Sequence, residues 1–446
     1  MNALQPPRRG ADTLAIAFAT TVAMWSLLYV AALPAVGGAL WLAIGLGVVG
    51  CLFVAGWLAG RYACRGAGGG AVLGLVIAGV SLLILLGLLG DEVGEHAGMA
   101  ALWILGLLAA AVGLCSLGAV LGCRRAAPPS RDVNWTSMLA WVTAITTLFM
   151  LASGGIVTGL EAGLAVDGWL IAEGHVLVLF PITLMQRDAD TFVEHAHRLW
   201  GLLVGLTTIV LMVHLWMVDR RRWVHGMSLA IVLAVVVQGI LGGTRVTEQS
   251  VVLAMVHGVV AQVIFATLVA TAMVTSTTWI GDRAATVAPT VGADRTLTVV
   301  LLAVILLQIV LGTLYRHLHP VPGVPTGALM GLLHGHSFVT SLLVVLIVLF
   351  CGVRSWGLYP GQPVVKRAGM ALSHTLILQV ILGIASFVVV PKGPRDHDDA
   401  ITVVEIVITT AHQVTGAILL ASAAALFVWQ RRLLGPGPAA RSSGRK

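Results

Sequence analysis

The feature that most constrains the fold is a succession of about twelve long apolar runs that carry almost no charge. A helix needs roughly 20 such residues to cross the hydrocarbon core of a bilayer. Only 10% of the residues are charged, against about 25% in a typical soluble protein. Lipid offers no partner for an open strand edge, so the runs are expected to be helices. The sequence therefore predicts an all-α polytopic membrane protein. The expected spans are residues 14–36, 39–60, 70–89, 98–122, 135–158, 194–217, 226–244, 250–275, 296–315, 328–353, 367–390 and 402–430.

The loops between these runs divide into two alternating sets. One set is rich in arginine, as at Arg220-Arg-Arg222, and the other contains segments such as Asp91–His96 and Lys392–Asp399. Because loops rich in Lys and Arg face the cytoplasm, both termini are expected on the cytoplasmic side of the inner membrane. The first run lacks a small-residue cleavage site, so no cleaved signal peptide is expected. The net charge of +7 lies mainly in these loops and the tail; it therefore indicates a lipid bilayer as partner and no nucleic acid.

Chain composition changes near residue 126. Residues 1–125 contain four expected spans rich in small residues, with no ionisable side chain deep inside any span; their role is not predicted. The later chain repeats the pattern Gln-x-x-Leu-Gly about every 70 residues, at Gln238, Gln308 and Gln379. This helix-pair period predicts an eight-helix core of two pseudo-symmetric four-helix bundles, residues 126–275 and 276–446.

Four histidines recur on alternate helices of this core, at His197, His257, His336 and His412. The topology puts all four on helices that run inward, in the outer half of the membrane. A single intramembrane histidine can be a packing residue, but four in one layer indicate a function. Neutral imidazole ligates haem iron, and two from neighbouring helices make a six-coordinate b-type site. The expected pairs are His197 with His257 and His336 with His412, one in each bundle.

Two of these positions offer a choice of histidine. In His195-Ala-His197 and in His334-Gly-His336, the two residues differ by about 200° around a helix. Only one of each can face a bundle interior. His334 therefore stays open as the alternative to His336.

Further polar residues surround the first histidine position. Glu194 stands three residues before His197, so both point to the same side of a helix. A carboxylate there can transfer a proton or stabilise a developing cation; alternatively, it is a first-turn Glu favoured by the helix dipole. Arg198 is suited to pair with a haem propionate. The glutamines Gln238, Gln308 and Gln379 are expected to make polar contacts near the outer helix ends.

Together these motifs resemble those of the haem A synthase family. The resemblance rests on Glu194–Arg198 as Glu-x-x-His-Arg, on Gln238–Gly243 before His257, on His412-Gln413, and on the loop Gly163–Trp169, over about residues 135–430. The resemblance implies haem b as cofactor at His336 and His412, and haem O as substrate at His197 and His257. It implies oxidation of the haem O methyl to the formyl of haem A for cytochrome oxidase assembly, with Glu194 as the catalytic carboxylate. Implied partners are haem O synthase, cytochrome oxidase assembly factors and an electron donor that the sequence does not identify.

The chain departs from the family pattern at several places. Val166 stands where a loop cysteine is common, Thr158 where an arginine is common, and Ser337 replaces the arginine after the second-half histidine. A thiol role is therefore not carried over. Two alternatives from other classes remain. One is a bis-His di-haem b cytochrome that takes electrons from quinol without substrate chemistry, and the other is a transporter built on the repeats.

Overall fold

The chain is a multi-pass, all-helical membrane protein. The computed structural model describes residues 10–32, 38–86, 97–124, 133–281, 286–288, 290–319, 323–359, 361–391 and 401–435. Eleven helices in these ranges are long and apolar enough to cross a membrane, and Ala67–Leu82 forms a shorter apolar helix. The predicted fold class is thereby confirmed; of the span expected at 70–89, residues 87–89 lie outside the described residues. The predicted loop segment Asp91–His96 and the segment Lys392–Asp399, which includes His397, lie outside the described residues.

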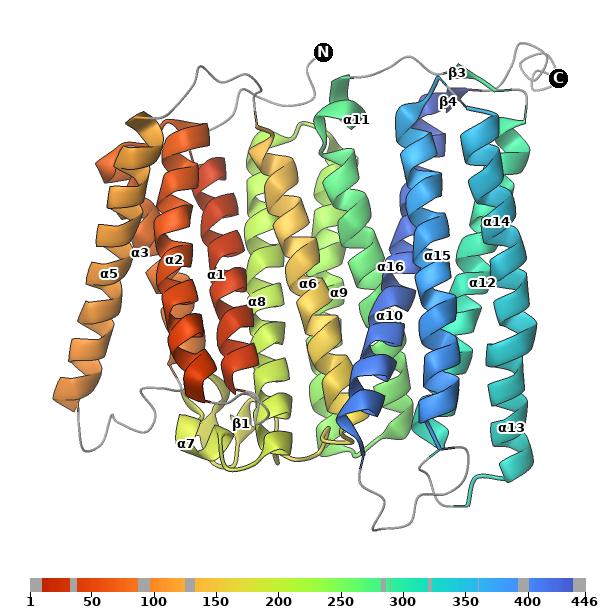
Figure 1. The fold of residues 1–446 in the computed structure, drawn as a ribbon, viewed down its shortest axis with the longest axis horizontal. Helices are drawn as coiled ribbons and strands as arrows, with labels where there is room; N and C mark the ends of the chain where they lie inside the picture. Colours follow the sequence, from red (N-terminus) through yellow and green to blue (C-terminus); the bar gives the residue numbers. More distant parts are fainter. Residues whose placement is uncertain are drawn as a thin grey trace. The chain divides into compact units, whose positions relative to one another are not determined.

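The long helices follow one another along the chain, and a longer loop precedes α8 (Figure 1). The first seven are α1 (Ala11–Ala32), α2 (Gly38–Ala63), α3 (Ala67–Leu85), α5 (Ala97–Arg124), α6 (Trp135–Gly159), α8 (Ala189–Val218) and α9 (Arg222–Thr247). The others are α10 (Val251–Val274), α12 (Val291–Leu318), α13 (Thr326–His334) continued by η2 (Gly335–Thr340) and α14 (Ser341–Gly357), α15 (Pro363–Val389) and α16 (Val403–Leu433).

By its internal packing, the chain divides into two compact units. Unit 1 is Met1–Ser153 with Ala162–Val232, and unit 2 is Gly154–Glu161 with Leu233–Lys446. The division passes through α6 and α9 rather than through the boundaries predicted at residues 125 and 275. Those domain boundaries stay a prediction.

In unit 1, helices α1, α2, α3 and α5 pack around a core of small apolar residues (Figure 1). A Cβ on Gly56 of α2 would lie 2.0 Å from the carbonyl oxygen of Cys115 in α5, and one on Gly118 would lie 2.2 Å from that of Phe53. Only glycine permits such a close approach of two backbones. Helix association in lipid relies on this kind of close packing, which explains the small-residue composition of this segment.

Helix α1 also packs on α8 in unit 1. The rings of Trp25 and Trp200 meet edge to face with centres 6.0 Å apart, and those of Tyr29 and Phe192 are 5.5 Å apart. Phe192 and Trp200 flank the polar stretch of α8. The N-terminal helices thus contact the helix that carries Glu194.

In unit 2, α16 packs against α10, α12 and α15, and α14 packs between α12 and α15 (Figure 1). A buried carboxylate, Asp294, joins the start of α12 to the end of α14. It accepts hydrogen bonds from Arg354 Nε at 2.5 Å and from the Tyr359 hydroxyl. Burial, together with this bond, raises the pKa of Tyr359 to about 12, so the hydroxyl remains a donor.

The strands are short. In unit 1, β1 (Ile171–Ala172) pairs antiparallel with β2 (His175–Val176). In unit 2, β3 (Thr286–Val287) pairs parallel with β4 (Leu434–Gly435), which ties the segment after α16 to the approach to α12.

Candidate functional site

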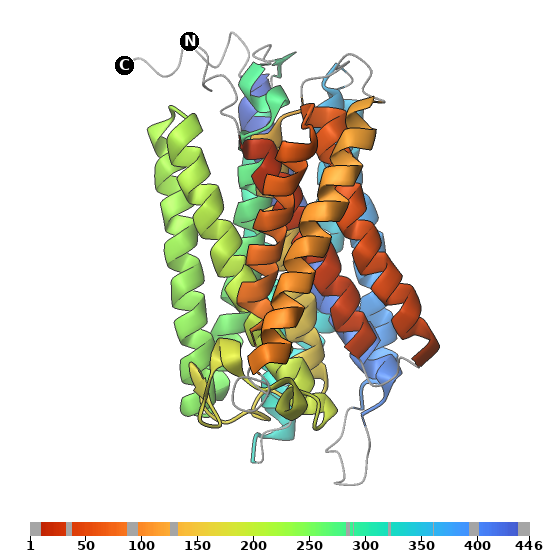
Figure 2. The same cartoon turned by 90° about the vertical axis from the view of Figure 1, so that its left-hand side faces the viewer.

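The loop before α8 in unit 1 folds around its own small core. Val166, Ala172 and Phe180 are 1% exposed or less and pack together. The β1–β2 turn, the 3₁₀ helix η1 (Leu177–Leu179) and the short helix α7 (Ile182–Met185) complete the loop at one end of α8 (Figures 1 and 2). Val166, at the position where a cysteine is common in the family, is thus a buried packing residue.

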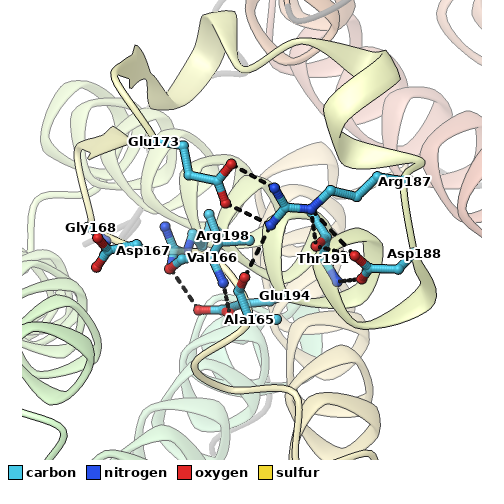
Figure 3. A network of polar contacts seen from close by, with 10 residues as sticks. All are labelled: Ala165, Val166, Asp167, Gly168, Glu173, Arg187, Asp188, Thr191, Glu194 and Arg198. Carbon is cyan, nitrogen blue, oxygen red and sulfur yellow. Dashed lines mark hydrogen bonds and ion pairs between the residues drawn. The ribbon is translucent and has the colours of Figure 1, made fainter.

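A polar network attaches this loop to the first turn of α8 (Figure 3). Asp188 caps the helix by accepting from the backbone N–H of Thr191 at 2.7 Å. That bond, assisted by Arg187, holds the pKa of Asp188 below its ordinary value. Arg187 also donates two hydrogen bonds to Glu173, at 2.6 and 2.7 Å. Sequence reasoning missed this network, although an Asp before an apolar helix is a known capping signal.

Glu194 lies beneath that loop and is 3% exposed. One carboxylate oxygen accepts from the Val166 N–H at 2.8 Å, and the other accepts from Arg198 Nη2 at 2.6 Å (Figure 3). The same Nη2 donates to the Val166 carbonyl at 2.8 Å. Glu194 and Arg198 thus hydrogen-bond the N–H and the carbonyl, respectively, of the same loop residue, Val166. Arg198 Nη1 has no hydrogen-bond partner among the described residues.

The two histidines of this stretch have different surroundings. His195 is 1% exposed and its ring stacks on Phe180 with centres 4.4 Å apart. His197 is half-buried on α8. His195 therefore packs on the loop before α8. His197 belongs to unit 1, and its predicted partner His257 belongs to unit 2.

In unit 2, each Gln-x-x-Leu-Gly repeat packs against the histidine of a following helix. The glutamine side chain contacts that histidine: Gln238 Nε2 donates to the His257 carbonyl at 2.7 Å, and Gln308 Nε2 donates to the His336 carbonyl at 2.9 Å. Gln379 Nε2 instead lies 3.4 Å from His412 Nε2. The glutamines thus contact the predicted ligand residues themselves, and a contact with a propionate stays a prediction.

The glycine of each repeat makes room for the imidazole. A Cβ added to Gly242, Gly312 or Gly383 would lie 2.9, 2.7 or 3.1 Å from Cε1 of the histidine ring of its repeat. Any larger residue would push the ring away. Glutamine, glycine and histidine therefore form one structural module, which occurs three times in this unit.

Two of these modules bring their histidines together. The rings of His336 and His412 are 6.2 Å apart at their centres, with planes at 86°. His334 points elsewhere: it is exposed, its Nδ1 contacts the Met330 carbonyl of its own helix at 2.7 Å, and its ring stacks on Phe338. Of the two candidates, His336 is thus the one beside His412. Among the described residues, no group of three His, Cys, Asp or Glu side chains could hold a metal ion.

These observations define a multi-pass helical membrane protein with paired intramembrane histidines. Residues 172–335 match the model of the family described as Cytochrome oxidase assembly protein (COX15-CtaA). This part of the chain is thus similar to that family. The matched range contains Glu194, His197 and His257 but ends one residue before His336.

One curated relative supports the same assignment. A heme A synthase of Alkalihalophilus pseudofirmus is 28% identical over 154 residues, which are 34% of this chain and 48% of the relative. The chain thus spans about half the length of the curated relative that it matches. No solved structure matches the chain.

Proposed function

We propose that this protein is a haem A synthase that oxidises the methyl group of haem O to the formyl group of haem A. The proposal places it in the inner membrane with both termini cytoplasmic, working with haem O synthase, cytochrome oxidase assembly factors and an electron donor. The observation that carries it is the His336–His412 pair within two glycine-cradled modules. The family match supports the same reading.

These two imidazoles are suited to ligate haem iron. Their ring centres are 6.2 Å apart, and neutral imidazoles are common ligands of haem iron. In addition, Gly312 and Gly383 have no side chain and so leave room for the two imidazole rings. His336 and His412 would therefore hold haem b, which supplies one-electron transfer when bound.

The acid–base part of the reaction is assigned to Glu194. Its carboxylate is buried beside Arg198, which stabilises its charged form in an apolar surrounding. A proton taken from substrate would end on the carboxylate oxygen now bonded to Arg198 Nη2. Arg198 Nη1, which has no partner among the described residues, is free to bind a substrate propionate. His197 and His257 remain the proposed ligands of the substrate haem.

The decisive experiment is haem extraction and mass analysis of the purified protein, combined with Glu194→Gln. Haem b together with haem O or haem A is expected. Glu194→Gln is expected to keep haem b and lose haem A formation, because an amide has the size of the carboxylate but does not take the proton; it can accept only one of the two hydrogen bonds that Glu194 accepts. Glu173→Gln is the matched control, since Glu173 belongs to the neighbouring loop ion pair. Normal haem A accumulation in Glu194→Gln would refute the catalytic role.

A bis-His di-haem b cytochrome is the second candidate, because the His336–His412 pair would serve electron transfer equally well. It predicts haem b alone in the extract. It also predicts no role for Glu194, so a Glu194→Gln protein that transfers electrons normally would favour it.

A further inference from the structure

The helix that carries His336 widens at that residue. Residues Gly335–Thr340 form a π-helical turn between α13 and α14, within the apolar segment Thr326–Gly357. Single π turns inside α-helices are frequent at functional sites, because the wider turn re-aims the side chains next to it. Here the turn begins directly beside the proposed iron ligand.

Hydroxyl groups add hydrogen bonds to two carbonyls of the wide turn. Thr340 Oγ1 donates to the Gly335 carbonyl at 2.9 Å, and Ser341 Oγ donates to the His336 carbonyl at 2.6 Å. Both bonds span five residues, the spacing of a π turn, whereas Thr375 in a regular helix donates to Ala371, four residues back. These additional hydrogen bonds stabilise the π turn.

Gln308 on α12 joins the same network. Its amide nitrogen donates to the His336 carbonyl and to Ser341 Oγ, at 2.9 and 2.8 Å, and its amide oxygen accepts from the Thr340 hydroxyl. Its backbone carbonyl meets His336 Nδ1 at 3.0 Å. A carbonyl can only accept, so Nδ1 carries the proton and Nε2 of the neutral ring keeps its lone pair for a metal.

The side chain of Gln379 contacts His412 differently. Its amide nitrogen lies against His412 Nε2 at 3.4 Å, on the nitrogen that would bind iron, and its amide oxygen has no hydrogen-bond partner among the described residues. The Gln379 backbone still interacts with the His412 imidazole, as the Gln308 backbone does with that of His336. The two modules therefore differ in their side chains: that of Gln379 would compete with a metal at Nε2, whereas that of Gln308 binds the His336 carbonyl.

From this difference we propose that His336 is the permanent axial ligand of the haem in unit 2 and that His412 is the exchangeable one. Gln308, Thr340 and Ser341 are positioning residues for His336, and Gln379 stabilises the state in which His412 is released. This inference rests on the proposed function, because it assumes that the two histidines bind haem iron. Release of His412 opens one coordination position for a small diatomic ligand.

The two glutamines allow a test by the same substitution. Purified Gln308→Leu and Gln379→Leu proteins are compared for haem retention during dilution and for carbon monoxide binding to the reduced haem. Gln308→Leu is expected to weaken haem retention about ten- to hundred-fold, as loss of an outer-shell partner does. Gln379→Leu is expected to keep haem retention and to lower carbon monoxide affinity about tenfold, the equivalent of one hydrogen bond. Weakened haem retention in both variants, or an unchanged carbon monoxide affinity in Gln379→Leu, would overturn the inference.

Substitution of the ligands themselves gives a second test. His412→Ala is expected to retain haem and bind carbon monoxide, whereas His336→Ala is expected to lose haem. Equal retention or equal loss in the two variants contradicts the proposed asymmetry. Haem missing from the unsubstituted protein would instead overturn the proposed function, and this inference with it.

The positioning role has its own readout, the midpoint potential of the haem. Thr340→Val keeps the side-chain shape but removes the hydroxyl bonds to Gly335 and Gln308, so the potential and haem retention are both expected to change. Thr375→Val, which removes only a bond within its own helix, is the matched control. An unchanged potential in Thr340→Val would show that the π-turn network does not act on the ligand.

Discussion

Replacement of Glu194 by leucine should release the loop before α8. Leucine leaves Arg198 as a buried charge without its carboxylate and leaves the Val166 N–H without its acceptor. Both side chains of the ion pair are less than 10% exposed, at 9% and 4%, so solvent screens the pair little. Breaking a buried pair on one side costs about 3–5 kcal/mol.

Hydrogen exchange at the Val166 amide measures this effect directly. A loss of about 3–5 kcal/mol corresponds to an exchange rate faster by roughly two to three and a half powers of ten. The control is Glu173→Leu, which breaks the Arg187 pair in the same loop. That pair is 37% and 24% exposed, and a solvated pair contributes about 1 kcal/mol or less, so exchange should rise less than about tenfold. Equal effects of the two variants on Val166 would refute the assignment of the loop clamp to Glu194.

Three further predictions follow from the packing and the electrostatics. Gly312→Ala should reduce bound haem, measured by absorbance, because its Cβ would lie 2.7 Å from an imidazole carbon, whereas Gly239→Ala, with open space around it, should not. Asp188 has a lowered pKa. Its capping bond therefore stabilises α8 fully at pH values above the ordinary carboxyl pKa of about 3.9. That stability should be lost as the pH falls through the lower folded-state pKa, and protease cleavage of the preceding loop at decreasing pH should show it. Trp25→Ala should lower the thermal midpoint through loss of the edge-to-face contact with Trp200, which contributes about 0.5–1.5 kcal/mol beyond its buried area; an unchanged midpoint would contradict this.

Much of the fold could be predicted from the sequence because its signals are local. Apolar runs of sufficient length predicted the spans, and eleven helices among the described residues are long and apolar enough to cross a membrane. The repeated spacing of Gln238, Gln308 and Gln379 also predicted repeated sites. The structure adds the reason for the glycine in each repeat, which is contact with a histidine ring.

The partners of Glu194 could not be predicted in the same way. Helical spacing placed it on the same side as His197, but its contacts are Arg198, one turn further along, and the backbone of Val166 in a distant loop. Which loop residue reaches a helix depends on how the loop folds around its own core. A residue pattern carries no direct signal of that fold.

His334 and His336 show most clearly what the sequence leaves open and only the tertiary structure can show. The sequence by itself determined that this is a membrane protein of many helices, with histidines repeated on alternate spans, because hydrophobicity and spacing act along the chain. Because the two histidines are about 200° apart on a regular helix, the sequence could not show which of them faces the interior of the bundle. The tertiary structure places His336 beside His412, with Gln308 from another helix and a π turn at Gly335–Thr340 holding it there. Hydrogen bonds between helices, formed only once those helices pack, stabilise that turn.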